Sequence, residues 1–252
     1  MSAVRPAAGT RVFVLTGAGI SAESGLGTFR DPGGLWRRFD PMRLATPEAF
    51  AGDPDEVHAF YNLRRAGVRK AAPNPAHAAL ARLQAGLAAA GGSLFLCTQN
   101  VDDLHERAGA GPVVHMHGEL LRARCLSCGA GTPWETDLGT DTPCPACGSR
   151  GGMRPDVVWF GEMPLHLDAI EAALAAADLF VAVGTSGSVY PAAGFVARAR
   201  ANGIATHEIN LAPSDTAGVF DTACYGPASR TVPAFAEAVL AGQPLPQGDQ
   251  GA

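Results

Sequence analysis

The sequence lacks several features that mark common classes of protein. No apolar run approaches the roughly 18 residues that span a membrane, and the N-terminal stretch MSAVRPAAGT holds no apolar core of a secretion signal. We therefore expect a cytoplasmic protein without a membrane partner. An excess of positive charge is also missing, because the net charge is −5. Proteins that hold nucleic acid through its phosphates need a basic surface, so we expect no nucleic acid to bind directly.

The chain does contain the material for a sizeable core. Its 252 residues are 47% hydrophobic and 17% charged, and this length suits one large domain or a domain with an inserted module. Alanine-rich stretches, which predict helices, separate most of the short apolar runs. Strands that alternate with helices are typical of a parallel sheet covered on both faces. The predicted strands are Val12–Leu15, Leu94–Thr98, Val113–Met116, Leu179–Val183 and Ile204–Ile209, and the predicted helices are Pro75–Ala90, Ile170–Ala177 and Pro191–Ala201.

A glycine-rich loop directly follows the first predicted strand. The stretch Gly17-Ala18-Gly19-Ile20-Ser21-Ala22 fits G-x-G-x-x-G/A, in which glycines let backbone N–H groups and a helix N-terminus approach a pyrophosphate. The alternative is a tight turn that binds nothing. A redox Rossmann unit would continue into a second strand ending in an acidic residue, but no clear second strand follows. The chain instead passes through Thr28-Phe29-Arg30-Asp31 to Trp36, a long loop that could fold over a bound nucleotide.

Polar residues follow the strand predicted over Leu94–Thr98. Because ligands of open α/β sheets bind at the carboxyl ends of the strands, we expect Asn100 and Asp102 to face the dinucleotide. An amide and a carboxylate can orient a ribose, a water or a carboxamide. The alternative is helix capping, since both residues open a predicted helix over Val101–Ala108.

A histidine follows the strand predicted over Val113–Met116. An imidazole is a natural general base near neutral pH, and His117 lies at the strand end with a glycine after it. His115 lies two residues earlier and has the less open approach, so we assign the general base to His117. The alternative is an ordinary turn histidine.

Four of the six cysteines form two C-x-x-C pairs in a stretch that breaks the alternation of strands and helices. Fifteen residues separate the pair Cys125/Cys128 from the pair Cys144/Cys147, which is typical of a zinc site closed by four thiolates. Such a site leaves no position for a substrate. We therefore expect one structural Zn²⁺, which a module too polar to fold alone requires. Disulfides or a redox dithiol are the alternatives.

Capping residues predict a helix that begins after Asp53. Val57, Phe60, Tyr61, Arg64 and Val68 follow at helical spacing and predict one apolar face that carries Arg64, with Arg65 turned to solvent. An arginine on an inward face needs a carboxylate partner. This partner is either an acidic residue of the chain or the substrate.

Taken together, these stretches resemble the sirtuins, the NAD-dependent protein deacylases. The resemblance spans about residues 10–240 and is carried by GAGISAESGLGTFR, TQNVDDLH, HGEL, the C-x-x-C pairs, GTSGSVYPA and INLAPS. It implies that NAD is a co-substrate and is consumed. In this family the acyl-lysine amide oxygen attacks the ribose carbon that bears nicotinamide, and nicotinamide leaves. A histidine at the His117 position then deprotonates a ribose hydroxyl, which attacks the imidate carbon, so that free lysine and O-acyl-ADP-ribose result.

The resemblance also implies roles for individual residues. Catalysis falls to His117 and Asn100. Tyr61 and Arg64 match the Y-x-x-R pattern of sirtuins that prefer succinyl- and malonyl-lysine. NAD is expected to contact Gly17, Ala18, Gly19, Ile20, Thr28, Phe29, Arg30, Trp36, Gln99, Asn100, Val101, Asp102, Gly184, Thr185, Ser186, Asn210, Leu211, Ala212 and Ala228.

Two further segments resemble the pair that clasps the peptide in this family. They are VVWFGE, residues 157–162, and GSVY, residues 187–190, and a substrate chain could pair with both as an added strand. A core strand is the alternative for the first. The acylated lysine and its peptide are expected to contact Tyr61, Arg64, Val158, Phe160, Gly161 and Val189.

We therefore predict an α/β fold, a Rossmann-like parallel sheet domain with an inserted small zinc-binding module and a helical insert. The expected limits are residues 1–39, 81–120 and 156–242 for the NAD-binding domain, 40–80 for the helical insert, 121–155 for the zinc-binding module and 243–252 for a disordered tail. The predicted activity is removal of succinyl, malonyl and acetyl groups from protein lysines. The alternatives are a mono-ADP-ribosyltransferase, a redox dehydrogenase and a non-catalytic module that senses NAD or ADP-ribose.

Overall fold

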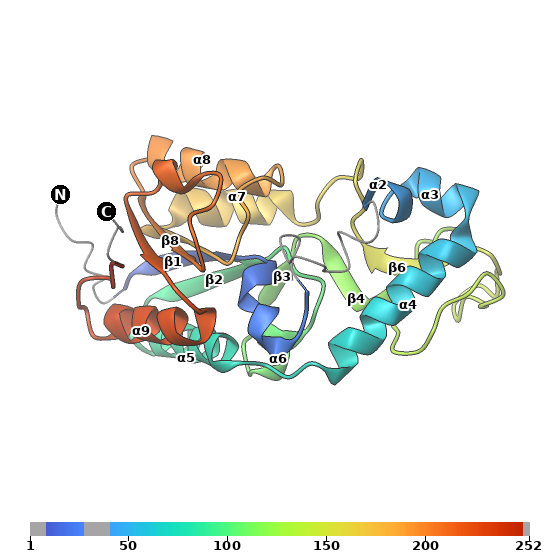
Figure 1. The fold of residues 1–252 in the computed structure, drawn as a ribbon, viewed down its shortest axis with the longest axis horizontal. Helices are drawn as coiled ribbons and strands as arrows, with labels where there is room; N and C mark the ends of the chain where they lie inside the picture. Colours follow the sequence, from blue (N-terminus) through green and yellow to red (C-terminus); the bar gives the residue numbers. More distant parts are fainter. Residues whose placement is uncertain (1–8, 28–40, 249–252) are drawn as a thin grey trace.

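A six-stranded parallel sheet forms the centre of the molecule in the computed structural model, which describes residues 9–27 and 41–248 (Figure 1). Its strands lie in the order β3-β2-β1-β7-β8-β9, so the direction of winding reverses between β1 and β7. Ligands of open α/β sheets bind at such a point, outside the carboxyl ends of the strands. The strands are β1 (Arg11–Thr16), β2 (Ser93–Thr98), β3 (Val113–His115), β7 (Leu179–Val183), β8 (Ala205–Asn210) and β9 (Thr222–Tyr225).

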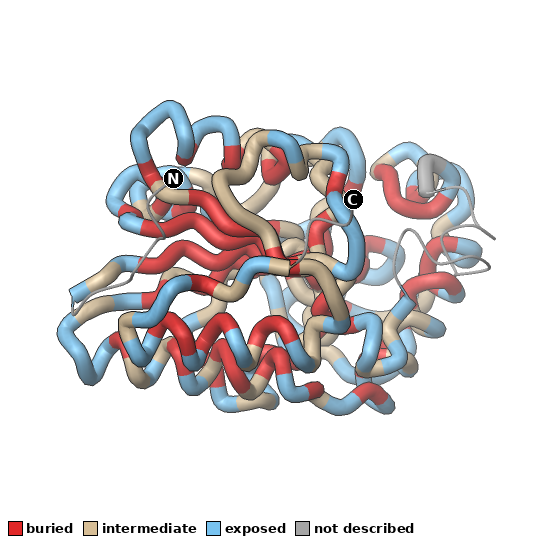
Figure 2. Tube along the Cα trace, turned by 60° about the vertical axis from the view of Figure 1, so that its left-hand side comes forward, coloured by how far each residue is buried: buried red, intermediate tan, exposed pale blue. Residues whose placement is uncertain are grey.

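Helices cover both faces of this sheet. One face packs against α5 (Pro75–Ala89) and α9 (Ala228–Leu240), and the other against α7 (Leu167–Ala176) and α8 (Phe195–Ala201) (Figure 1). The alternation of side chains along β1 explains the two layers. Val12 and Val14 belong to the core beneath α5 and α9, whereas Phe13 and Leu15 belong to the core beneath α7 and α8. Strands with two buried faces are mostly apolar, although β8 also buries Thr206, His207 and Glu208, and Figure 2 shows the strands buried between the helices.

Two long connections carry the remaining elements. Between β1 and β2 lie α2 (Pro41–Leu44), α3 (Pro47–Gly52) and α4 (Pro54–Lys70), and α6 (Leu104–Arg107) follows β2. Between β3 and β7 lies a separate antiparallel sheet in the order β5-β4-β6, formed by β4 (Gly118–Cys125), β5 (Gly131–Pro133) and β6 (Met153–Val157). Phe50 and Val57 of the helical connection share a core with Leu120 and Trp159 of the sheet connection. Short 3₁₀ helices complete the fold at Ala18–Ile20, Ala22–Ser24, Ala192–Gly194 and Ala217–Val219.

The predicted fold class is confirmed, with differences at particular elements. The side chain of Asp53 accepts a hydrogen bond from Glu56 N at 2.9 Å and begins α4 as expected. The helix predicted over Val101–Ala108 is limited to α6. None of the helices in the described ranges is both long and apolar enough to cross a membrane.

The tail predicted to be disordered from Gln243 is placed as far as residue 248. Leu245 is buried in the core beneath α5 and α9, and Gly248 N donates to Ala223 O at 3.2 Å. The buried side chain of Leu245 and the backbone hydrogen bond of Gly248 therefore attach this otherwise polar segment to the domain. The rest of the predicted tail lies outside the described residues.

Candidate active site

The glycine loop after β1 packs backbone to backbone against the loop after β7. A Cβ added at Gly17 would lie 2.8 Å from Gly184 O, and a Cβ added at Gly19 would lie 2.7 Å from Gly184 Cα. Gly19 N donates to Gly184 O at 2.9 Å, and Gly184 itself has a φ of +62°. Side chains at these positions would force the two loops apart. The glycines therefore bring the ends of β1 and β7 together at the winding reversal.

A cavity of about 870 Å³ opens at these strand ends. This volume lies in the range of about 300–1,000 Å³ that is usual for small-molecule sites. The cavity gathers most of the predicted cofactor residues: Gly17, Ala18, Gly19, Gln99, Asn100, Val101, Asp102, Gly184, Thr185, Ser186, Asn210, Leu211, Ala212 and Ala228.

The structure does not bring every predicted residue to this cavity. Ile20 is fully buried and packs in the core beneath α5 and α9 instead of lining the cavity. Its apolar side chain turns inward from the start of the loop, where burial from water is favourable. Four further predicted cofactor residues, Thr28, Phe29, Arg30 and Trp36, lie outside the described residues.

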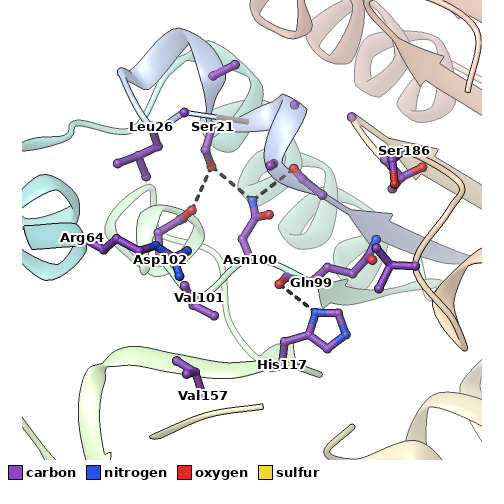
Figure 3. Close-up of a pocket in the computed structure, with 18 of the residues that line it drawn as sticks. Ser21, Leu26, Arg64, Gln99, Asn100, Val101, Asp102, His117, Val157 and Ser186 are labelled. Atoms are coloured by element: carbon purple, nitrogen blue, oxygen red, sulfur yellow. Dashed lines mark hydrogen bonds between the residues drawn. The ribbon is translucent and has the colours of Figure 1, made fainter. Parts of the chain in front are cut away.

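Asn100 and Asp102 are joined through a serine that the sequence analysis did not single out. The Asn100 amide Nδ2 donates to Gly17 O at 3.1 Å and to Ser21 Oγ at 3.2 Å, and Ser21 Oγ donates to Asp102 Oδ2 at 3.1 Å (Figure 3). Both amide hydrogens of Asn100 are thereby occupied, while no described residue donates to its Oδ1, which can meet a ligand. The signal for Ser21 in the sequence was its place in the glycine loop, four residues after Gly17.

Asp102 has a structural part as well as a place in the cavity. Its Oδ1 accepts a hydrogen bond from Leu104 N at 3.2 Å at the start of α6. Asp102 therefore caps this helix through one oxygen and contacts Ser21 through the other. Burial raises the pKa of the Asp102 carboxyl, while the hydrogen bonds from Leu104 and Ser21 lower it. The carboxyl is thus held rigidly in a poorly solvated part of the cavity.

The two histidines near the end of β3 have different surroundings. His115 is buried, with Nε2 2.7 Å from Glu106 Oε1 and Nδ1 3.3 Å from Asn100 O. Burial lowers the pKa of His115, but the hydrogen bond and charge of Glu106 outweigh it and raise the pKa overall. His115 is therefore held between two oxygen acceptors, away from the cavity.

His117 lines the cavity and is arranged as a base. Its Nδ1 lies 3.1 Å from Gln99 O (Figure 3). A carbonyl only accepts, so Nδ1 carries the proton and Nε2 keeps its lone pair. Burial lowers the pKa of His117, and the contact with Gln99 O only partly offsets this effect. The imidazole is neutral at physiological pH and can take up a proton at Nε2.

Helix α4 brings Tyr61 and Arg64 to the same cavity. The Tyr61 hydroxyl accepts a hydrogen bond from Trp159 Nε1 at 3.0 Å, and the Arg64 guanidinium carbon lies 5.5 Å from the centre of the Tyr61 ring. Figure 3 shows Arg64 reaching from α4 toward Asp102. Burial lowers the pKa of Arg64, while Tyr61 and the Asp102 charge raise it. Asp102 is thus one carboxylate of the chain near Arg64. The alternative that Arg64 pairs with an acidic residue of the chain requires such a neighbour.

The prediction for Arg65 is wrong. Arg65 is 1% exposed, and its Nε donates to Leu120 O at 3.1 Å while its Nη1 donates to Asn62 Oδ1 at 2.7 Å. Burial lowers the pKa of its guanidinium. The part of α4 that is turned away from solvent includes Arg65 as well as Arg64. The Leu120 carbonyl of β4 is the hydrogen-bond partner of Arg65.

The predicted peptide-binding residues lie along the other wall of the cavity. Val158 N donates to His117 O at 2.8 Å and Phe160 N donates to Ala45 O at 2.9 Å, so the segment after β6 is fixed beside His117. Val158, Phe160, Gly161 and Val189 all line the cavity. Phe160 remains 40% exposed.

The loops after β7 and β8 form the far end of the cavity. Asn210 Nδ2 donates to Thr185 O at 2.8 Å, and Asn210 Oδ1 accepts from Leu211 N at 3.0 Å. Leu211 is 74% exposed, although it borders the cavity. The Asn210 side chain therefore holds the two loops together, besides facing any ligand.

The four cysteines form a cluster that fits a zinc ion. Their sulfur atoms all lie within 4.8 Å of one another, with 3.9 Å between Cys125 and Cys147 and 3.8 Å between Cys128 and Cys144. Four thiolates at about 2.3 Å from a tetrahedral Zn²⁺ would lie about 3.8 Å apart. A disulfide would need about 2.05 Å, so that alternative does not apply. Four thiolates would fill every position around a tetrahedral Zn²⁺, so the cluster suits a structural metal and leaves no position for a substrate.

Comparison with known proteins bears on the identity of this fold and cavity. A sequence profile described as the Sir2 family matches residues 17–191. An NAD-dependent protein deacylase of Caulobacter vibrioides is 64% identical over 92% of this chain and 97% of its own length. One from Escherichia coli K12 is 52% identical over 92% of this chain and 83% of its own length. A solved complex of a Sir2 homologue with NAD is 41% identical, covers 92% of this chain and 89% of its own, and has a TM-score of 0.82. The chain belongs to the Sir2 family.

Proposed function

We propose that this protein is an NAD-dependent protein-lysine deacylase that consumes NAD and accepts succinyl- and malonyl-lysine as well as acetyl-lysine. Relatives at 64% and 52% identity are named NAD-dependent protein deacylases, and a homologue of known structure holds NAD. The observation that carries the proposal is the content of one cavity. This cavity holds the imidazole of His117, the amide of Asn100, and the two loops that contain Gly17 and Gly184. It also holds the guanidinium of Arg64 beside the hydroxyl of Tyr61.

The base role follows from the geometry of His117. With its Nδ1 proton directed at Gln99 O, the ring presents Nε2 to the cavity and cannot turn without losing that bond. In the proposed reaction, Nε2 takes the proton of a ribose hydroxyl so that the oxygen can attack the imidate carbon. Burial keeps the ring unprotonated beforehand. The lysine amine then leaves, and a water molecule opens the remaining cyclic species, so that free lysine and O-acyl-ADP-ribose are the products.

Asn100 and the loops are proposed to hold NAD. The amide of Asn100 is oriented by Gly17 O and Ser21, so its Oδ1 can accept from a ribose hydroxyl or a positioned water. Beyond it, the glycine loop offers close backbone approach for a pyrophosphate, and the loops after β7 and β8 border the space left for the rest of the dinucleotide.

The acyl class rests on Arg64 and Tyr61. An acetyl group offers a guanidinium no acceptor at its methyl end, whereas succinyl and malonyl chains end in a carboxylate. Arginine pairs strongly with carboxylates, and the Tyr61 hydroxyl beside it is a second donor. Burial keeps the pKa of Tyr61 above its usual value, so the hydroxyl retains its hydrogen.

The test is a panel of acetyl-, succinyl-, malonyl- and long-chain acyl-lysine peptides incubated with NAD and analysed by mass spectrometry. We expect each turnover to release one nicotinamide, one free lysine and one acyl-ADP-ribose, with the highest kcat/KM for the carboxylated acyl groups. Nicotinamide release without loss of an acyl group would support the ADP-ribosyltransferase. Binding of NAD without turnover would support the sensor module, and a change in nicotinamide absorbance would support the dehydrogenase.

The remaining predictions concern partners and location. We propose acylated lysines of proteins or peptides as the substrates, without direct binding of nucleic acid or membrane, in the cytoplasm. The net charge of −5 is the reason to expect no direct binding of nucleic acid. The domain limits given above likewise stay predictions.

A further inference from the structure

Trp159 lies beside Tyr61 in the wall of the cavity and directs a hydrogen-bond donor at it. The indole is 2% exposed, and its Nε1 lies 3.0 Å from the Tyr61 hydroxyl. Indole Nε1–H is a donor only. The Tyr61 oxygen must therefore accept this bond, and its own hydrogen is left to point elsewhere.

The hydrogen of Tyr61 is thereby reserved for an acceptor in the cavity. Tyr61 is 2% exposed and borders the cavity. Its neighbours Arg64 and Arg154 have only donors. The Glu162 carboxylate, which also acts on Tyr61, accepts hydrogen bonds from Arg154 and from Trp159 N. Among the residues that the structure describes, none is placed as an acceptor for the Tyr61 O–H group. Without Trp159, the hydroxyl could turn its hydrogen away from the cavity.

A buried arginine holds Trp159 in place. The Arg154 guanidinium carbon lies 3.3 Å from the centre of the Trp159 ring, and Arg154 is 2% exposed. Its Nη1 and Nη2 donate to the two oxygens of Glu162 at 2.6 Å and 3.0 Å. Glu162 Oε2 also accepts from Trp159 N at 2.8 Å, so both the ring and the backbone of Trp159 are fixed. Phe50 contacts the ring as well, with ring centres 5.3 Å apart.

We propose that Trp159 is a positioning residue for acyl selectivity: it orients the Tyr61 hydroxyl so that its hydrogen points at the carboxylate of a succinyl or malonyl group. The inference rests on the proposed function, because it needs a carboxylated acyl chain beside Arg64. It assigns Trp159, which also borders the cavity, a role that acts through the Tyr61 hydroxyl. The arrangement from Glu162 through Arg154 to Trp159 fixes the donor of this bond before the substrate arrives.

The experiment compares Trp159→Phe with wild type on matched succinyl- and acetyl-lysine peptides. Phenylalanine keeps an aromatic ring against Arg154 and Phe50 but has no N–H group. We expect the ratio of desuccinylation to deacetylation kcat/KM to fall about 3- to 10-fold, as loss of one neutral hydrogen bond predicts, with the change mainly in KM for the succinyl peptide. Phe50→Leu is the matched control, because it loosens packing on the same ring and keeps the hydrogen bond. Its ratio should stay at the wild-type value.

A double-mutant cycle tests whether Trp159 acts through Tyr61. In a Tyr61→Phe background there is no hydroxyl to orient, so adding Trp159→Phe should not lower the ratio further. Equal losses in both backgrounds, or a parallel fall of both activities in Trp159→Phe, would overturn the proposal and leave Trp159 a packing residue.

A spectroscopic readout separates failure of this inference from failure of the proposed function. The chain has three tryptophans, and the indole N–H resonance of Trp159 is the one that Trp159→Phe removes. Tyr61→Phe should shift this resonance whatever the acyl preference is. An unchanged resonance would refute the hydrogen bond itself. A shifted resonance, in an enzyme whose Arg64→Met variant has an unaltered acyl preference, would refute the acyl assignment and with it the selectivity role of Trp159.

Discussion

Replacing Arg64 by methionine tests the acyl assignment most directly. Arg64 lies in the cavity on α4, with its guanidinium 5.5 Å from the Tyr61 ring centre and 5.6 Å from the Phe60 ring centre. Methionine keeps much of the length and apolar volume of the side chain and removes the charge. The substitution therefore removes the cation while largely preserving the packing of the helix.

The expected loss follows from the kind of bond that is removed. Hydrogen bonds to charged groups are worth about 1.5–3 kcal/mol, and about 1.4 kcal/mol is tenfold in rate. Desuccinylation kcat/KM should fall about 10- to 100-fold, whereas deacetylation should change far less because acetyl has no carboxylate. The lost cation–π contacts are each worth about 0.5 kcal/mol at exposed sites to about 2 kcal/mol at desolvated ones, so the melting temperature should also fall. The ratio of the two activities, which stability does not affect, is therefore the deciding measurement.

The assay is steady-state kinetics on paired succinyl- and acetyl-lysine peptides, with thermal unfolding of each variant. Arg69→Met is the matched control, because Arg69 lies on the same helix, outside the cavity, and is largely exposed. The ratio of the two activities should be unchanged in this control. If Arg64 instead serves only an internal pair with Asp102, both activities of Arg64→Met will fall in parallel together with the melting temperature, and the acyl assignment is refuted.

Further predictions concern the base, the metal and the loops. His117→Ala should lower turnover about 100-fold or more while NAD binding, measured by calorimetry, persists; near-normal acyl removal would exclude the base role. Because the pKa of His117 is lowered, the base protonates only below its usual pKa of about 6.5, so the acid limb of kcat/KM should have its midpoint below that pH. A midpoint above it would contradict the burial argument. Cys144→Ser should lower zinc content by elemental analysis and reduce folded protein, and a metal-free, fully active variant would show that the cluster is not structural. Gly19→Ala places a Cβ 2.7 Å from Gly184 Cα, so NAD binding and melting temperature should both fall, and wild-type values would show that the loops can move apart.

The sequence predicted the central sheet well because its strands are buried on both faces. Runs such as Val12–Leu15 and Leu179–Val183 are apolar throughout, and the structure confirms both as strands. The edge strand β9 was not predicted, since its sequence, Thr-Ala-Cys-Tyr, is short and only partly apolar. Its place depends on pairing with β8, which the segment alone does not reveal.

Contacts between distant segments set the limits of prediction at the site. Helical spacing could not assign Arg65 to the interior, because its acceptor is Leu120 O, 55 positions away in the chain. Ser21 was overlooked for the same reason, as its partners Asn100 and Asp102 come from another loop. The C-x-x-C spacing, by contrast, was enough to predict all four candidate metal ligands. The structure confirms that their sulfur atoms lie close together.

The separation of Tyr61 and Arg64 from the reacting groups has a consequence for how such an enzyme can diversify. Both lie on one turn of α4, whereas His117 and Asn100 follow strands of the central sheet. On the proposed assignment, substitutions on that turn alter which acyl chains are accepted without disturbing the bond between His117 and Gln99 O. Changes at these two cavity positions would then be enough to alter the substrate range in a lineage or in the laboratory, while the residues proposed to act on NAD stay in place.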